Sequence, residues 1–170
     1  MDDLAAHVRT YCTLSTLSAE ADAALSGVVA SLQGASSGGR TLLQLIESSQ
    51  EVLTSTDDGV RNRGTMLLAE VLTRHAPALL AGQTPAQVAT LLSFFADRLQ
   101  DEPCVREVLR GARRAVDSVE PGAGPEVAAA VAKLCDGVFT HVHVQSLSLC
   151  LLYTSPSPRD LSTSRMPSSA

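Results

Sequence analysis

Residues 57–106 decide the fold, and they read DDGVRNRGTMLLAEVLTRHAPALLAGQTPAQVATLLSFFADRLQDEPCVR. Two short stretches inside this segment match each other: DDGVR at 57–61 and EPCVR at 102–106. Each places acidic residues at a turn and Val-Arg about one turn into an apolar helix. In helix-pair repeats, such a valine fills the core between the paired helices, while the acid caps its helix and can pair with an arginine of the adjacent repeat. The match therefore predicts two consecutive repeats.

The flanking sequence supplies the partner helices. Apolar residues recur at helical spacing in five segments, at 41–54, 57–75, 84–99, 103–116 and 125–138. Thr84-Pro85 is a helix cap followed by proline at the first helical position, and we expect the last of these helices to end near Gly137. First helices starting near 41, 84 and 125 have the spacing of HEAT repeats. The predicted fold is an all-α HEAT/armadillo-type solenoid of antiparallel helix pairs, an N-terminal fragment; an ordinary helical bundle is the alternative.

We divide the chain into three parts. Residues 1–39 hold two weaker helices, at 2–12 and 18–33, followed by a Gly/Ser-rich joint. Residues 40–149 hold the HEAT-like repeats, and residues 150–170 form an irregular, disordered tail.

The tail differs from the rest of the chain in composition. Ser, Thr and Pro make up 11 of its 21 residues. Its sequence CLLYTSPSPRDLSTSRMPSSA resembles the translation of a sequencing-library adapter. We therefore expect the natural protein sequence to be interrupted near Leu149, and the tail to be an artefact.

Composition narrows the function. The net charge is −5, aromatic residues make up 3% and there is no Trp, which disfavours direct binding of nucleic acid. The charged residues near the N-terminus do not suit a signal peptide, and no apolar run reaches the length of a membrane span. The four scattered Cys, with no CxxC pair, predict reduced thiols and no disulfide framework.

Three segments carry a family resemblance: GVRNRGTMLLAEVLTRH at 59–75, LLSFFADRLQDEPCVREVLRGARRAV at 91–116 and VFTHVHVQSL at 138–147. They resemble the N-terminal HEAT repeats of the methyl-methanesulfonate-sensitivity-nineteen family, nucleotide-excision-repair and transcription-regulator proteins. FADRLQD at 95–101 and VHVQSL at 142–147 are the most specific parts. The three segments cover about half of the chain, and the resemblance is thin over 1–38.

The resemblance implies a function. Members of this family are scaffolds of the cytosolic iron–sulfur assembly targeting complex, and they bring the assembly factors to apo-proteins such as DNA helicases and polymerases. For this chain, the resemblance implies a non-catalytic adaptor without a cofactor of its own. Such an adaptor acts in the cytoplasm and nucleus and supports DNA repair. It also implies protein partners and no membrane.

The candidate partner-binding residues are four arginines at helical spacing: Arg106, Arg110, Arg113 and Arg114. They could dock acidic clients, or contact DNA if the protein is instead a nucleic-acid-associated transcription or repair factor. The simpler reading is a solvated helix face balanced by Glu102, Glu107 and Asp117.

Other chemistry finds less support. Cys135, His141 and His143 lie close in sequence, but a zinc or iron–sulfur site needs four ligands, and the two histidines would point about 200° apart on a helix. No nucleotide-binding, hydrolase or metalloprotease motif is present. We therefore expect neither a metal site nor an enzyme.

Overall fold

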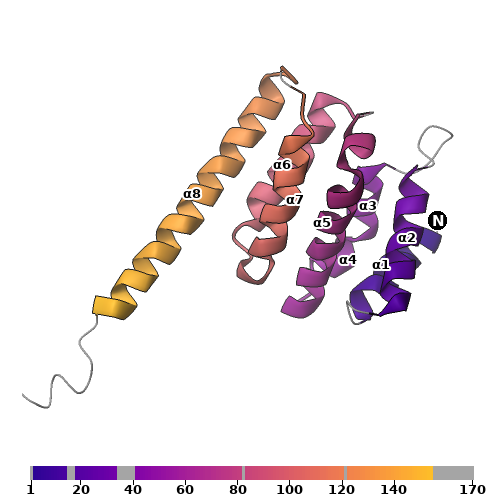
Figure 1. The fold of residues 1–170 in the computed structure, drawn as a ribbon, viewed down its shortest axis with the longest axis horizontal. Coiled ribbons are helices and arrows are strands. Elements are labelled where there is room, and N and C mark those ends of the chain that lie inside the picture. Colours follow the sequence, from indigo (N-terminus) through magenta and orange to yellow (C-terminus); the bar gives the residue numbers. More distant parts are fainter. Residues whose placement is uncertain (1, 15–17, 34–40, 82, 121, 155–170) are drawn as a thin grey trace, which may run out of the picture. The chain divides into compact units, whose positions relative to one another are not determined.

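The computed structural model describes residues 2–14, 18–33, 41–81, 83–120 and 122–154, with side chains described within 3–145. The chain divides into two compact units, Met1–Val138 and Phe139–Ala170. Every regular element in the described ranges is a helix (Figure 1). The all-α solenoid fold is confirmed.

The first unit opens with a helix pair. α1 (Asp2–Thr13) packs against α2 (Ala19–Gln33), as predicted for this region. Large apolar side chains from both helices are fully buried between them and α5, among them Leu4, Val8, Val28 and Leu32. The predicted Gly/Ser joint at 34–39 lies outside the described residues.

The helix predicted over 41–54 is divided into two, α3 (Leu42–Ser48) and α4 (Gln50–Leu53). Thr41 caps α3 through a reciprocal pair of hydrogen bonds with Gln44. The division falls at Ser49, which is fully buried and whose hydroxyl donates to the Leu45 carbonyl at 2.7 Å. Such a back-bond can bend a helix, but buried Thr65 makes the same bond to the Arg61 carbonyl within the unbroken helix α5, so the hydroxyl alone does not account for the break.

Two long helices follow. α5 (Asp58–Leu80) is capped by Asp57, whose Oδ1 accepts from the Val60 amide at 3.0 Å. It continues past residue 75, where the predicted helical segment ends, and through Pro77, which has no N–H to donate to the helix. α6 (Pro85–Arg98) begins at the predicted Thr84 cap.

Next come a short 3₁₀ turn, η2 (Glu102–Cys104), then α7 (Val105–Asp117), which packs against α6, and then α8 (Pro125–Thr154). The predicted end of the last helix near Gly137 is wrong, because α8 runs through it. A Cβ at Gly137 would lie 2.8 Å from Leu99 Cδ1. The glycine therefore lets the Leu99 side chain pack closely against α8 and does not end the helix.

One continuous core connects the helices of the first unit, up to and including the part of α8 that ends at Val138. Its centre lies between α5, α6 and α7, where Phe95 is fully buried against the position of Gly111. α8 contributes Val127, Ala130 and Leu134 to this core.

One expectation about the C-terminal region needs correction. α8 includes Cys150–Thr154, so the irregular tail does not begin at Cys150; residues 155–170 lie outside the described residues. The segment Pro125–Gln145 is also long and apolar enough to span a bilayer by length and composition, with a mean hydropathy of 1.2. This is weak evidence for a membrane helix, because core helices pass the same test.

Candidate functional site

Asp101 joins two consecutive helix pairs. Arg61, near the start of α5, donates to it from Nε at 2.9 Å and from Nη2 at 3.1 Å, and Arg98 at the end of α6 donates from Nη1 at 3.2 Å. The three side chains are only 16–19% exposed. The pairing of the turn acid with an arginine of the adjacent repeat is confirmed for Asp101.

The two arginines also hold the preceding turn. Arg61 donates to the Ser55 carbonyl at 2.9 Å, and Arg98 to the Leu53 carbonyl at 2.5 Å. Hydrogen bonds from the Arg61 guanidinium hold the pKa of Asp101 below its ordinary value against the opposing effect of burial. The Asp101 carboxylate makes no helix-capping hydrogen bond. Of the two acidic turns, the one at Asp57 caps a helix and the one at Asp101 pairs repeats.

The four predicted arginines do not act alike. Arg110, 36% exposed, spans α5 and α7: its Nη1 lies 2.7 Å from Glu70 Oε1, and its Nη2 lies 2.8 Å from Glu107 Oε2. The second contact is an ion pair whose angle is unsuited to a hydrogen bond. The sequence led us to expect Glu107 on a solvated helix face. Its side chain is only 5% exposed, so that expectation is wrong. Arg110 therefore has a structural role.

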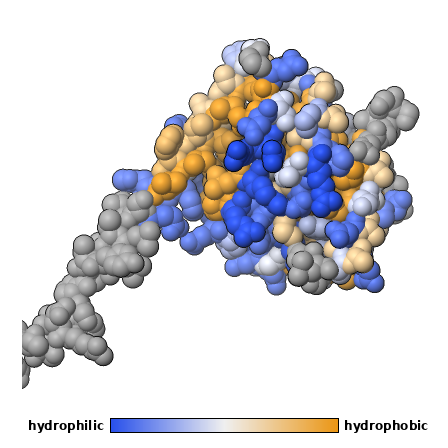
Figure 2. Space-filling model, in the orientation of Figure 1, coloured by the Kyte–Doolittle hydropathy of each residue, from blue (hydrophilic) through white to orange (hydrophobic). Residues whose placement is uncertain are grey.

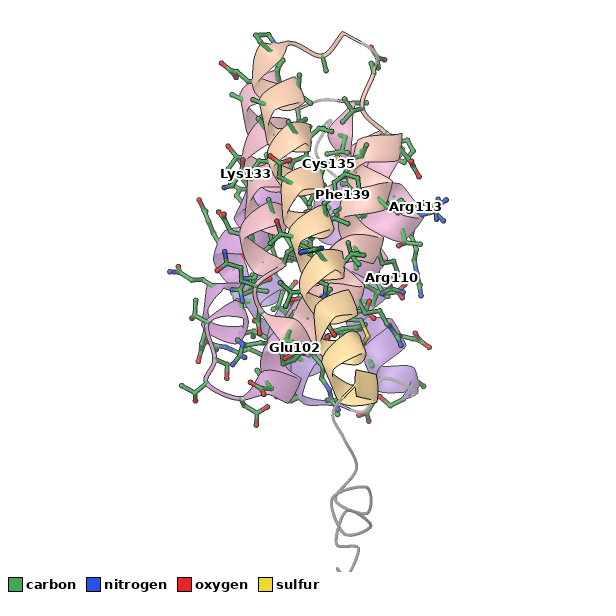
Figure 3. All side chains as sticks on the ribbon, turned by 90° about the vertical axis from the view of Figure 1, so that its left-hand side faces the viewer. Glu102, Arg110, Arg113, Lys133, Cys135 and Phe139 are labelled. Carbon is green, nitrogen blue, oxygen red and sulfur yellow. The ribbon has the colours of Figure 1, made fainter. Side chains whose placement is uncertain are left out.

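The other three arginines are exposed. Arg106 is 92% exposed and reaches Glu107 Oε1 from Nε at 3.1 Å, while Arg113 is 81% exposed and lies 3.7 Å from Asp117. Arg114 is also exposed, in the last turn of α7. Figure 3 shows Arg110 and Arg113 projecting from the same side of the helix. Of the four arginines, Arg106, Arg113 and Arg114 are therefore the ones exposed to a partner.

Sequence reasoning missed Glu70. It lies on α5, 40 positions before Arg110, and binds both Arg110 and Arg74. Tyr11 of α1 lies near this cluster: burial raises the pKa of Tyr11, and the negative charge of Glu70 raises it further. Glu70 and Arg110 are 40 residues apart, like Arg61 and Asp101. Glu70 lies in the middle of a helix, however, so no turn in the sequence points to it.

We expect Arg110→Glu to lower the free energy of unfolding by about 2 kcal/mol, because it adds a third carboxylate beside Glu70 and Glu107. Arg113→Glu should change it by less than about 0.5 kcal/mol, since that side chain is exposed. Urea denaturation followed by circular dichroism checks both. Equal stability of the two variants would contradict the structural role of Arg110.

The cysteines divide by burial. Cys12 and Cys104 are buried, and Cys135 is exposed. Burial raises the pKa of Cys12 to about 11, and it raises the pKa of Cys104 as well. In the described part of the chain, no three His, Cys, Asp or Glu side chains are grouped to hold a metal ion. The absence of a metal site remains a prediction, as does the absence of catalysis.

Thiol labelling tests this division in a Cys150→Ser background. We expect iodoacetamide at pH 8 to modify Cys135 within minutes, and Cys12 and Cys104 only when the protein opens, because a protonated buried thiol is unreactive. Mass spectrometry of peptides taken over time gives the three rates. Comparable rates for Cys12 and Cys135 in the folded protein would contradict the burial of Cys12.

Stacked helix pairs, an inter-repeat ion-pair cluster and an exposed arginine face define this chain as a HEAT-like α-solenoid fragment. The comparisons identify the family. Residues 46–150 match the family described as "Dos2-interacting transcription regulator of RNA-Pol-II". The chain belongs to this family, and the match ends where its composition changes.

Curated relatives carry the name MMS19 nucleotide excision repair protein homolog. The protein from Dictyostelium discoideum is 36% identical over 107 residues, which cover 63% of this chain and 9% of the relative. The Danio rerio protein is 36% identical over 118 residues (68% and 10%), and the Mus musculus protein 37% over 112 residues (65% and 10%). This chain thus spans about a tenth of these relatives. No solved structure gives a significant match.

Proposed function

We propose that this chain is a non-catalytic scaffold region of a protein that supports DNA repair through cytosolic iron–sulfur protein assembly. The family membership is the observation that carries the proposal, together with relatives named for nucleotide excision repair. In this role the chain helps to bring assembly-targeting factors to apo-proteins such as DNA helicases and polymerases. It acts in the cytoplasm and the nucleus, with protein partners and no membrane.

The structure is compatible with a scaffold that acts through its outer surface. The ion pairs at Asp101 and Arg110 fix successive helix pairs relative to one another within the first unit. A rigid stack of repeats presents a surface formed by several helices at once, and many weak contacts on it can hold a partner without chemistry.

The test is affinity capture from cell extract with the tagged chain. We expect cytosolic iron–sulfur assembly factors and iron–sulfur helicases to be recovered above the level of a tagged unrelated helical protein. Quantitative mass spectrometry gives the enrichment. Recovery equal to the unrelated protein, from a chain that circular dichroism shows to be folded, would count against the proposal.

The alternative is a nucleic-acid-associated transcription or repair factor that contacts DNA through the arginines of α7. The family description as a transcription regulator favours it, but the ion pairs of Arg110 weaken it. Such binding would fall steeply with salt. Fluorescence anisotropy with a labelled duplex at 50 and 200 mM salt, for the wild type and Arg106→Glu/Arg113→Glu, distinguishes this alternative from a protein scaffold.

A further inference from the structure

We propose that a strip of α7 docks an acidic amphipathic helix of a partner protein. The strip consists of Arg106, Leu109 and Arg113, and the partner helix carries two carboxylates seven residues apart with an apolar side chain between them. The proposal rests on the scaffold function proposed above and specifies the chemistry of a partner.

Exposure sets this strip apart from the rest of α7. Arg106 is 92% and Arg113 81% exposed, and between them Leu109 is 38% exposed, whereas Val105, Val108 and Ala112 are buried. Leu109 is the only large hydrophobic residue exposed on α7. A leucine flanked by two guanidiniums forms a small apolar patch with positive charge at both ends.

The charge of this strip is opposite to that of the chain. The chain has a net charge of −5, yet the two carboxylates next to the strip, Glu70 and Glu107, are only 22% and 5% exposed and lie around Arg110. Glu107 Oε1 also accepts a hydrogen bond from Arg106 Nε at 3.1 Å. Figure 2 shows hydrophilic residues gathered over the face that α5 and α7 form. The guanidiniums of Arg106 and Arg113 thus stay largely exposed, although each has one carboxylate neighbour, Glu107 for Arg106 and Asp117 for Arg113.

Acidic residues also flank the strip. Glu102 is exposed one turn before Arg106, and Asp117 is 53% exposed one turn after Arg113, with 3.7 Å between its Oδ2 and Arg113 Nε. An exposed pair at this distance is weak and can exchange for a better-placed partner carboxylate. The flanking acids repel an extended polyanion such as DNA, so a short segment with two separated carboxylates is favoured.

Helix geometry fixes the spacing of the partner. Arg106 and Arg113 are seven residues apart, or about 10 Å along the axis of α7. Carboxylates at positions i and i+7 of a second helix have the same separation, and an apolar side chain at i+3 or i+4 then lies over Leu109. This is the pattern Glu-x-x-Leu-x-x-x-Glu, with charge complementarity at both ends and an apolar contact at the centre.

The experiment measures the binding of a fluorescein-labelled, 21-residue Ala-rich helical peptide that carries this pattern once. Anisotropy titrations use the full chain, the double variant Arg106→Glu/Arg113→Glu, and the control Arg9→Glu/Lys133→Glu. The control changes the net charge equally at two exposed residues elsewhere. We expect the strip variant to bind at least tenfold more weakly, and the control within threefold of the wild type.

Replacing the central leucine of the peptide with serine should weaken binding about fivefold, since part of its apolar surface is no longer buried. Absence of binding, equal losses for the strip and control variants, or equal binding of the serine peptide would each overturn the proposal. Stronger binding of a DNA duplex than of the peptide would do so too. Capture of assembly factors from extract tests the scaffold function separately. If the double variant Arg106→Glu/Arg113→Glu captures them normally, the docking strip is wrong while the proposed scaffold function is retained.

Discussion

Replacing Phe95 with alanine lowers the free energy of unfolding by about 4 kcal/mol, a larger loss than we expect from any other single substitution in the chain. Phe95 of α6 is fully buried, and its ring lies over Gly111 of α7, a position that also lies close to the Ala69 backbone of α5. Truncation leaves a cavity where three helices meet. Urea denaturation followed by circular dichroism at 222 nm measures the change.

Phe139→Ala is the matched control, because it makes the same truncation at a side chain that is 74% exposed. It should change the stability by less than about 1 kcal/mol. A similar loss for both variants would show that Phe95 does not lie at the centre of the core.

A second substitution tests the contact itself. A Cβ at Gly111 would lie 2.9 Å from Phe95 Cζ, so Gly111→Ala should destabilise the wild-type protein by overpacking. In the Phe95→Ala background the ring is absent, and the same change should be neutral or stabilising. The coupling between the two substitutions measures the contact. Strictly additive effects would contradict the close packing of α6 on α7.

Local signals explain which parts of the fold were predictable. The cap at Thr84 depends on residues within one turn, so the sequence indicates where α6 begins. The passage of α8 through Gly137 depends on a distant residue, Leu99, that lies against it. The division at Ser49 involves a local bond to the Leu45 carbonyl, but whether such a serine breaks the helix depends on its surroundings. Serine and glycine have several possible roles, and a single sequence does not select among them.

The candidate surface was predictable only in part, for the same reason. The spacing of Arg106, Arg110 and Arg113 places them on one helix. Which of them faces solvent depends on Glu70, a residue 40 positions before Arg110 that comes close only after α5 and α7 have packed. A periodic charge pattern thus identifies the helix face but does not distinguish buried ion pairs from available ones.

Replacing Asp101 with asparagine should lower the free energy of unfolding by about 2–3 kcal/mol at pH 7, because it removes the charge that binds Arg61 and Arg98 in a largely buried cluster. The loss should depend on pH. The pKa of Asp101 is lower in the folded protein than in the unfolded chain, so its carboxylate stabilises the fold above the unfolded value of about 3.9. That contribution is lost as the pH falls through the folded pKa.

The difference between the two proteins should therefore be full from pH 6 upward and should narrow progressively below about pH 4, as measured by urea denaturation from pH 6 to pH 3. Asp97→Asn is the control, since that aspartate is 69% exposed and pairs with Lys133; its effect should stay below about 0.5 kcal/mol at every pH. If the difference between wild type and Asp101→Asn persists undiminished to pH 3, the stabilisation comes from the shape or packing of the side chain and not from its charge. The repeats would then be joined by their apolar core alone, and the ion pairs of Asp101 with Arg61 and Arg98 would have no role in stacking.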